Sequence, residues 1–167
     1  SDDEINSIQD KSILIGQFDP LSDKERLNIL IKKNINIFSL NLLPRITRAQ
    51  SMDVLSSQAN LAGYRAVIET VEEFGKAVPM MMTAAGTITP AKVLVIGAGV
   101  AGLQAIATAK RLGAVVSATD VRTVAKEQVE SLGAKFLVVE GAENLETSEG
   151  YAKEAGEDFK KKQAELL

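Results

Sequence analysis

Apolar residues in this chain fall into short dense runs that alternate with helical stripes. KSILIGQF at residues 11–18 and INIFSLNLL at 35–43 are rich in apolar and β-branched residues, which predicts two short buried strands. Between them, Ser22 or Asp23 can cap a helix that runs to about Lys33. A strand–helix–strand unit of this kind predicts that the two strands are parallel.

A long helical pattern follows, from Thr47 to about Lys76. At about 30 residues and 1.5 Å per residue it would span roughly 45 Å, which suits a connector between two domains. Gly63 inside it costs about 1 kcal/mol relative to alanine, so we expect this glycine to permit close packing. PMMMTAAGTITP at residues 79–90 is bounded by proline and punctuated by glycine, which is typical of a linker.

The second half of the chain alternates strands and helices more regularly. KVLVI at 92–96, AVVSATD at 114–120 and KFLVVE at 135–140 predict three strands, separated by helices at 100–112 and 123–132. This β-α-β-α-β order is typical of one mononucleotide-binding half of a doubly wound sheet. A polar, acidic loop and a charged helix, YAKEAGEDFKKKQAELL, complete the pattern.

The predicted fold class is therefore α/β, with two Rossmann-like parallel-sheet units joined by a long helix. We expect a partial first α/β domain at residues 1–46, the connecting helix and linker at 47–90, and a partial Rossmann domain at 91–167. A complete dinucleotide fold normally has about six strands. Both units are therefore expected to be incomplete here, and the chain, which begins without methionine, to be a fragment truncated at both ends.

Composition narrows the classes of function. A net charge of −3 and a pI near 5.1 disfavour nucleic acid and anionic membrane surfaces as partners, since both favour a basic face. No apolar run reaches the roughly 18 residues that a membrane-spanning helix needs. The chain has no cysteine and no histidine, which excludes thiolate chemistry, imidazole zinc sites and histidine acid–base catalysis. No metal site is expected.

A glycine motif carries the candidate chemistry. GAGVAG at 97–102 matches G-x-G-x-x-G directly after a predicted strand and at the start of a predicted helix. In this pattern Gly97 permits a tight turn, Gly99 lets the backbone approach a pyrophosphate, and Gly102 lets helix and strand pack closely. The N–H groups at the helix start would then hold the phosphates. The alternative is a glycine turn that serves packing only.

An acidic residue completes the motif. Asp120 ends the next predicted strand, about 20 residues further on, where it would accept hydrogen bonds from the adenosine ribose hydroxyls. Its charge would repel a 2′-phosphate, which favours NAD over NADP. Arg122 favours NADP instead, because an arginine can bind that 2′-phosphate.

A second polar segment, RITRAQSMD at 45–53, carries two cations, an amide and a carboxylate just before the long helix. Thr47 as N-cap and Gln50 three residues later can form a capping box, and Asp53 in the first turn favours the helix dipole. Capping leaves Arg45 unexplained. The other interpretation is a ligand clamp near the junction of two domains, where cofactor sites commonly form. The residues by themselves leave both interpretations open.

Three stretches together resemble the NAD(H)-binding domain I (alpha subunit) of proton-translocating nicotinamide nucleotide transhydrogenase: RITRAQSMDVLSSQANLAGYRAV, PMMMTAAGT and VLVIGAGVAGLQAIATAKRLGAVVSATDVRTVAKEQVESLGAKF. The match runs from about residue 40 to the end of the chain. The resemblance implies that NAD(H) is bound by this chain and that hydride passes directly from NADH to NADP+ on a partner domain. Such a transfer needs no proton donor at either nicotinamide carbon, which fits the absence of histidine.

The resemblance also assigns roles to residues. Arg45, Gln50 and Asp53 would reach the nicotinamide end and form the catalytic set that positions the ring, with Ser56 one turn further on. The glycine loop and the segment after the next strand would hold the adenosine half: Gly97, Gly99, Val100, Gly102, Asp120, Val121 and Arg122. Tyr151 lies in a segment that resembles a mobile loop over the site. Apart from the resemblance, the run Met80 to Met82 would either line the cleft through soft, adaptable contacts or pack in the core or linker.

Partners follow from the same resemblance. It implies an NADP-binding domain and a proton-translocating membrane domain, with a homodimer in the full-length domain. The expected location is peripheral, as a soluble domain on the cytoplasmic face of the bacterial inner membrane or the matrix side of the mitochondrial one. Neither nucleic-acid binding nor direct membrane insertion is expected, and the isolated fragment is expected to be inactive without its partner domains.

Two other functions stay open. An alanine-dehydrogenase-like NAD oxidoreductase would need a histidine proton donor, which this chain lacks. A non-catalytic NAD(H)-binding module, which would transmit the redox state of its ligand to a partner, is compatible with every residue named above.

Overall fold

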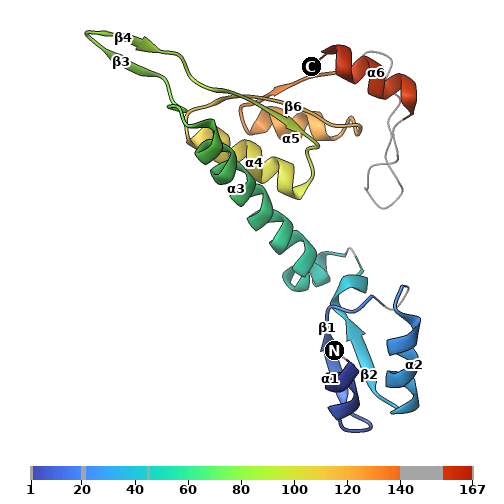
Figure 1. The fold of residues 1–167 in the computed structure, drawn as a ribbon. Helices are drawn as coiled ribbons and strands as arrows, with labels where there is room; N and C mark the ends of the chain where they lie inside the picture. The colour runs from blue at the N-terminus through green and yellow to red at the C-terminus, as the bar shows by residue number, and fades with distance from the viewer. Residues whose placement is uncertain (1, 20–21, 45, 140–155, 167) are drawn as a thin grey trace. The chain divides into compact units, whose positions relative to one another are not determined.

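The computed structural model describes residues 2–19, 22–44, 46–139 and 156–166. The chain divides into two compact units, Ser1–Leu55 and Ser56–Leu167, each containing parallel strands (Figure 1). The predicted fold class, α/β with parallel-sheet units, is confirmed.

The first unit is a strand–helix–strand arrangement preceded by a short helix. Its elements are α1 (Asp2–Ser7), β1 (Ile13–Gly16), α2 (Lys24–Lys32) and β2 (Asn36–Ser39). The strands β1 and β2 are parallel, with Leu14 opposite Ile37. Asp23 caps α2, since its carboxylate accepts a hydrogen bond of 3.2 Å from the backbone N–H of Arg26. The second strand is shorter than predicted, because the chain turns at Leu40–Leu42 into a 3-10 helix, η1.

The segment expected to be one long helix is two helices. A 3-10 helix, η2, spans Thr47–Met52, and the α-helix α3 spans Val54–Phe74. The capping box predicted at Thr47 and Gln50 is therefore wrong: the residue before η2 is Ile46, and no side chain caps that end. Asp53 lies between the two helices and directly before α3, which is where an aspartate is favoured as a cap.

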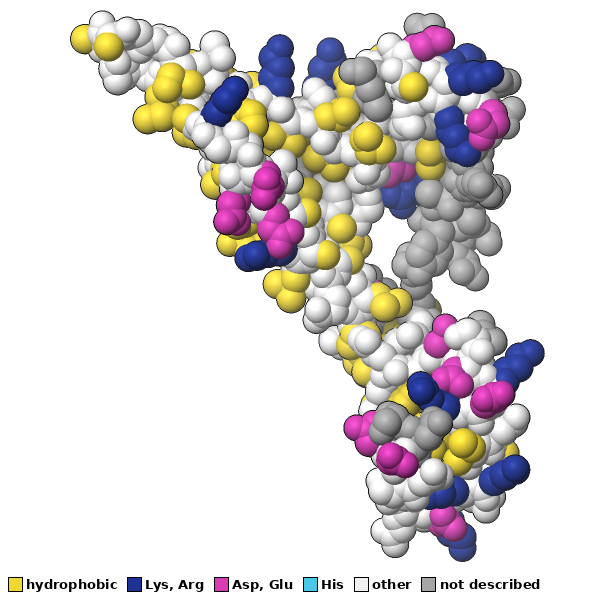
Figure 2. All heavy atoms as spheres, in the orientation of Figure 1, with side chains coloured by type: hydrophobic (Ala, Val, Ile, Leu, Met, Phe, Trp, Pro, Cys, Tyr) yellow, Lys and Arg dark blue, Asp and Glu magenta, His cyan; other side chains and the backbone are white. Residues whose placement is uncertain are grey.

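The segment expected to be a linker is a β-hairpin. Strands β3 (Met81–Thr83) and β4 (Gly86–Ile88) pair antiparallel, with Met82 opposite Thr87. The hairpin extends from the rest of its own unit (Figure 1) and carries apolar side chains on its surface (Figure 2). Met82 is 72% exposed and Ile88 53%.

The second unit holds a parallel sheet in the order β5-β6-β7. The strands are β5 (Lys92–Ile96), β6 (Val115–Thr119) and β7 (Lys135–Phe136), and the helices that follow them are α4 (Val100–Arg111), α5 (Ala125–Ser131) and α6 (Glu157–Leu166). Each strand is parallel to its neighbour, with Val95 opposite Ala118. This confirms the predicted β-α-β-α-β order, although β7 is shorter than the six residues expected.

The core of the second unit lies between this sheet and its helices. Ile106 on α4, Val116 and Ala118 on β6, and Val129 on α5 are all at most 2% exposed and belong to one apolar cluster. Burying the isoleucine and valine side chains stabilises the fold by about 1.5–3 kcal/mol each, and burying the alanine methyl group by less. The sheet and the helix starts at its carboxyl edge are therefore held firmly, and the glycine motif lies at that edge.

Membrane spans and metal clusters are both missing from the part of the chain that the structure describes. Within residues 2–19, 22–44, 46–139 and 156–166, no helix combines the length and apolar character needed to cross a membrane. The same ranges contain no group of three or more potential metal ligands.

Candidate functional site

The glycine loop joins β5 to α4 by a turn that only glycine adopts readily. Gly97 has a φ of +93°, a conformation that costs other residues energy because of their Cβ atom. Its N–H donates a hydrogen bond of 2.8 Å to the carbonyl of Thr119, at the end of β6. The turn is thereby anchored to the neighbouring strand.

The other two glycines differ in their surroundings. A Cβ atom added to Gly102 would lie 1.8 Å from the carbonyl oxygen of Gly97, so the first turn of α4 contacts the loop backbone directly. A Cβ added to Gly99 would meet only the Nη2 atom of Arg122, at 3.9 Å. The expectations for Gly97 as the turn and Gly102 as the close contact are confirmed. The backbone at Gly99 is open, as an approaching phosphate would require.

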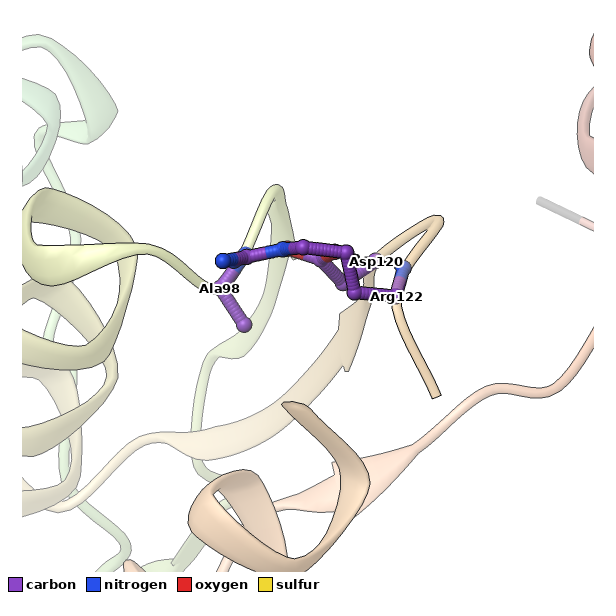
Figure 3. A network of polar contacts seen from close by, with 3 residues as sticks. All are labelled: Ala98, Asp120 and Arg122. Carbon is purple, nitrogen blue, oxygen red and sulfur yellow. Dashed lines mark hydrogen bonds and ion pairs between the residues drawn. The ribbon is translucent and has the colours of Figure 1, made fainter. Parts of the chain in front are cut away.

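The carboxylate of Asp120 lies at the centre of a hydrogen-bond network with Ala98 and Arg122 (Figure 3). Its Oδ2 atom accepts a bond of 2.6 Å from the backbone N–H of Ala98 and one of 3.1 Å from Nη2 of Arg122. Its Oδ1 atom accepts a bond of 2.8 Å from the backbone N–H of Arg122 and one of 3.0 Å from Nε of the same side chain. The carboxylate therefore ties the glycine loop to the end of β6 and pairs with Arg122 through two nitrogens.

The electrostatics of this network favour the ionised carboxylate. The side chain of Asp120 is 5% exposed and that of Arg122 is 17% exposed. Burial raises the pKa of Asp120, while the hydrogen bonds from the Arg122 side chain and from the backbone N–H groups of Arg122 and Ala98 lower it. The lowering is larger, so the pKa of Asp120 lies below its ordinary value of 3.8.

One polar group next to this network is unpaired. The hydroxyl of Thr119, the last residue of β6, is buried and has no hydrogen-bond partner among the described residues. A buried hydroxyl in this condition costs about 1–3 kcal/mol.

Sequence reasoning missed the contact between α3 and α4. A Cβ added to Gly63 would lie 2.0 Å from the carbonyl oxygen of Ala101, in the first turn of α4. The prediction that Gly63 permits close packing is confirmed, and its partner is the helix that begins at the glycine loop. Nothing in the sequence identified Ala101 as that partner, nor Ala98 as a donor to Asp120.

The residues assigned to the nicotinamide end belong to other parts of the chain. Arg45 lies outside the described residues, as does Tyr151. Gln50 is exposed on η2 and Asp53 is half-buried at its end. Both residues belong to the first unit.

The remaining assigned residues lie in the second unit. Ser56 is half-buried on the first turns of α3. Val100, the first residue of α4, is 45% exposed, and Val121 is half-buried beside the Asp120 network. The second unit thus brings together the residues assigned to the adenosine half.

A strand, a glycine turn, the start of a helix and an acidic residue at the end of the next parallel strand are the elements of the Rossmann-type dinucleotide-binding fold. The chain belongs to the alanine dehydrogenase/PNT family. Residues 66–165 match the C-terminal domain of that family and residues 1–62 its N-terminal domain.

Curated relatives are transhydrogenase subunits. The chain is 60% identical over 167 residues to the first part of NAD(P) transhydrogenase subunit alpha of Rhodospirillum rubrum, covering 99% of this chain and 44% of that protein. It is 46% identical over 166 residues to the NAD(P) transhydrogenase subunit alpha of Haemophilus influenzae, covering 99% of this chain and 32% of the relative. The chain thus spans less than half the length of these relatives.

Solved structures are similar to this chain as well. The transhydrogenase from Sinorhizobium meliloti matches with a TM-score of 0.83 and 54% identity, over 99% of this chain and 44% of that one. An L-alanine dehydrogenase matches with a TM-score of 0.64 and 20% identity, over 81% of this chain and 38% of that one, which shows a common fold. The resemblance to transhydrogenase drawn from the sequence is confirmed.

Proposed function

We propose that this chain is the NAD(H)-binding part of a proton-translocating transhydrogenase, in which hydride passes directly from NADH to NADP+ held on a partner domain. The glycine loop carries the proposal. The N–H groups in the first turn of α4 have no partner within the helix and carry a partial positive charge, which suits a pyrophosphate. The open backbone at Gly99 leaves room for it, and the similarity to transhydrogenase subunits supports the choice of reaction.

The adenosine half of the ligand is assigned to the second unit. Asp120 lies at the end of β6, where an acidic residue accepts hydrogen bonds from ribose hydroxyls, and its lowered pKa keeps it ionised at neutral pH. Val100 and Val121 offer apolar surface beside it. A negative carboxylate also disfavours a 2′-phosphate, so this site takes NAD(H) in preference to NADP(H).

The nicotinamide half is assigned to the segment before α3. Arg45, Gln50 and Asp53 would orient the ring and its carboxamide by hydrogen bonds, with Ser56 in support. The bound NADH supplies the hydride, and these residues contribute position. Holding the two reacting groups at near-attack distance, with water kept out, accounts for most of the rate such a reaction needs.

The partners in this proposal are an NADP-binding domain and a proton-translocating membrane domain. The location would be peripheral, at the cytoplasmic or matrix face of the membrane, and two copies of the full-length domain would associate. This chain would need the NADP-binding domain for hydride transfer, because the hydride acceptor is bound there, and the membrane domain for proton translocation.

The first test is a titration of the chain with NADH and, separately, NADPH, followed by nicotinamide fluorescence. We expect saturable NADH binding, weaker NADPH binding, and loss of NADH affinity in Asp120→Ala and Arg45→Ala. Gln50→Ala should also lose affinity, whereas Gln58→Ala, the same change at an exposed position on α3, should not. Equal losses in both glutamine variants would contradict the assigned nicotinamide site.

The second test is transfer itself. Mixing the chain with a separately prepared NADP-binding domain should give NADH-dependent reduction of an NADP+ analogue, read from its shifted absorbance. Intact NADH binding with no transfer would favour the non-catalytic binding module. An alanine-dehydrogenase activity is not favoured, because no residue of the chain is a histidine that could serve as the proton donor.

A further inference from the structure

We infer that Arg122 determines the nucleotide preference of this site by competing with the adenosine ribose for the carboxylate of Asp120. The inference rests on the proposed function and deepens it. It concerns a residue that the glycine motif itself does not include, and it predicts opposite effects of one substitution on NADH and on NADPH.

The carboxylate of Asp120 has a limited capacity for donors. Two carboxylate oxygens offer about four lone-pair sites in all. In this structure four N–H donors occupy them, at 2.6 and 3.1 Å on Oδ2 and at 2.8 and 3.0 Å on Oδ1. A ribose hydroxyl that donates to Asp120 must therefore replace one of these donors.

Only some of the four donors can leave. The N–H groups of Ala98 and of residue 122 are backbone groups, fixed by the loop and by the end of β6. The other two donors, Nε and Nη2, sit on the rotatable side chain of Arg122. Ribose binding thus exchanges hydroxyl donors for the guanidinium and leaves the backbone bonds in place.

The guanidinium also lies close to the glycine loop. The Nη2 atom of Arg122 is the atom nearest to a Cβ built on Gly99, at 3.9 Å. The guanidinium is therefore bonded to the carboxylate assigned to the ribose and also lies near the backbone assigned to the pyrophosphate. In Figure 3 the side chain of Arg122 runs alongside the Asp120 carboxylate toward Ala98.

The consequence differs for the two nucleotides. NADH must break a bidentate, mostly buried ion pair and offers neutral hydroxyls in exchange, so Arg122 weakens its binding. NADPH brings a 2′-phosphate that pairs with the displaced guanidinium in the fork geometry that arginine favours. Arg122 thus offsets part of the repulsion between that phosphate and Asp120.

The test compares four proteins in the fluorescence titration: the unchanged chain, Arg122→Met, Arg122→Lys and Arg111→Met. Methionine keeps much of the length of the side chain and removes its donors, while the backbone N–H of residue 122 still bonds to Asp120. Arg111, exposed in the last turn of α4, controls for the change in net charge. Circular dichroism verifies that each variant is folded.

Arg122→Met should tighten NADH binding by roughly three- to tenfold, the size expected for one charge-assisted pair, and weaken NADPH binding by a similar factor. Arg122→Lys keeps the positive charge but not the forked donors of the guanidinium, so its affinities for NADH and NADPH should lie between those of the unchanged chain and those of Arg122→Met. In an Asp120→Asn background the gain for NADH should disappear, because the competition acts through that carboxylate. Arg111→Met should change neither affinity.

The outcomes separate this inference from the proposed function. If the unchanged chain binds NADH and Arg122→Met binds it more weakly, Arg122 is a direct ligand contact, and the inference is overturned while the function stands. Equal changes for NADH and NADPH also overturn it. If no folded variant binds either nucleotide, the proposed function fails, and the inference with it.

Discussion

The same substitution at two glycines of one loop should separate folding from binding. At Gly102, a Cβ atom would stand 1.8 Å from the carbonyl oxygen of Gly97, a backbone atom that no side-chain rotation can move away. Reaching a tolerable separation requires a shift of roughly 1.4 Å between α4 and the loop, and overpacking of this kind costs about 1–3 kcal/mol or more. The higher helix propensity of alanine stabilises the folded chain by about 1 kcal/mol relative to glycine. On these values, Gly102→Ala should destabilise the chain by up to about 2 kcal/mol, and by more where the overpacking exceeds this range.

At Gly99 the same change meets almost nothing, with one side-chain nitrogen at 3.9 Å. The φ of −77° and ψ of −165° at Gly99 suit alanine. Alanine is a poorer N-cap than glycine, but it also reduces the conformational entropy of the unfolded chain, so the free energy of unfolding should change by no more than about 1 kcal/mol. The new methyl group would instead occupy the path of the pyrophosphate. Losing one or more charge-assisted hydrogen bonds of about 1.5–3 kcal/mol each predicts at least tenfold weaker NADH binding.

The assay is urea unfolding followed by far-ultraviolet circular dichroism, with NADH titration of each folded variant in parallel. Gly102→Ala should shift the unfolding midpoint clearly downward, and Gly99→Ala should leave it nearly unchanged while losing affinity. A Gly102→Ala chain as stable as the original would refute the close contact. Full NADH affinity in Gly99→Ala would refute the placement of the phosphates.

Three further predictions follow from the same contacts. Gly63→Ala should lower the unfolding midpoint in urea by an amount similar to Gly102→Ala, because its Cβ would lie 2.0 Å from the carbonyl of Ala101; an unchanged midpoint would contradict that contact. Thr119→Val, which removes an unpaired buried hydroxyl at nearly constant shape, should leave stability unchanged or raise it by about 1 kcal/mol, and a clear loss in the same unfolding assay would show that the hydroxyl has a partner. The folded-state pKa of Asp120 lies below 3.8, so the contribution of its ionised carboxylate to stability is full above pH 3.8 and is lost as the pH falls through the folded-state pKa. In Asp120→Asn, the decline of the unfolding free energy between about pH 5 and pH 2 should therefore be less steep. An unchanged decline would count against the ion pair.

Much of the second unit could be predicted because each local signal agreed with the others. The run KVLVI, the glycine turn at 97–102 and the glycines that close the helices each specify one element, and the structure has them in that order. Gly113 and Gly133 end their helices with φ values of +89° and +75°, a conformation that strongly prefers glycine. Sequence is informative where a backbone conformation admits few residue types.

The errors lie where the signals were ambiguous. Apolar residues three and four apart fit both a 3-10 helix and an α-helix, so nothing in the spacing separated Thr47–Met52 from α3. The hairpin at Met81–Ile88 has no buried face, and without one a strand need not alternate polar and apolar residues. The pairing of Arg122 with Asp120 was equally hidden, since charges two residues apart do not reveal whether they meet.

The close approach of Gly63 to Ala101 has a mechanical meaning. Because the two backbones are too close to admit a Cβ atom, α3 cannot move toward α4 at this point, whereas a tilt about the contact keeps the two backbones together. Ser56, in the first turn of α3, is roughly 10 Å along the axis from this pivot, so a tilt of about 5° displaces it by about 1 Å. Ala101 is followed by Gly102, whose backbone contacts the turn at Gly97. A tilt of α3 would therefore press, through Ala101, on the glycine loop.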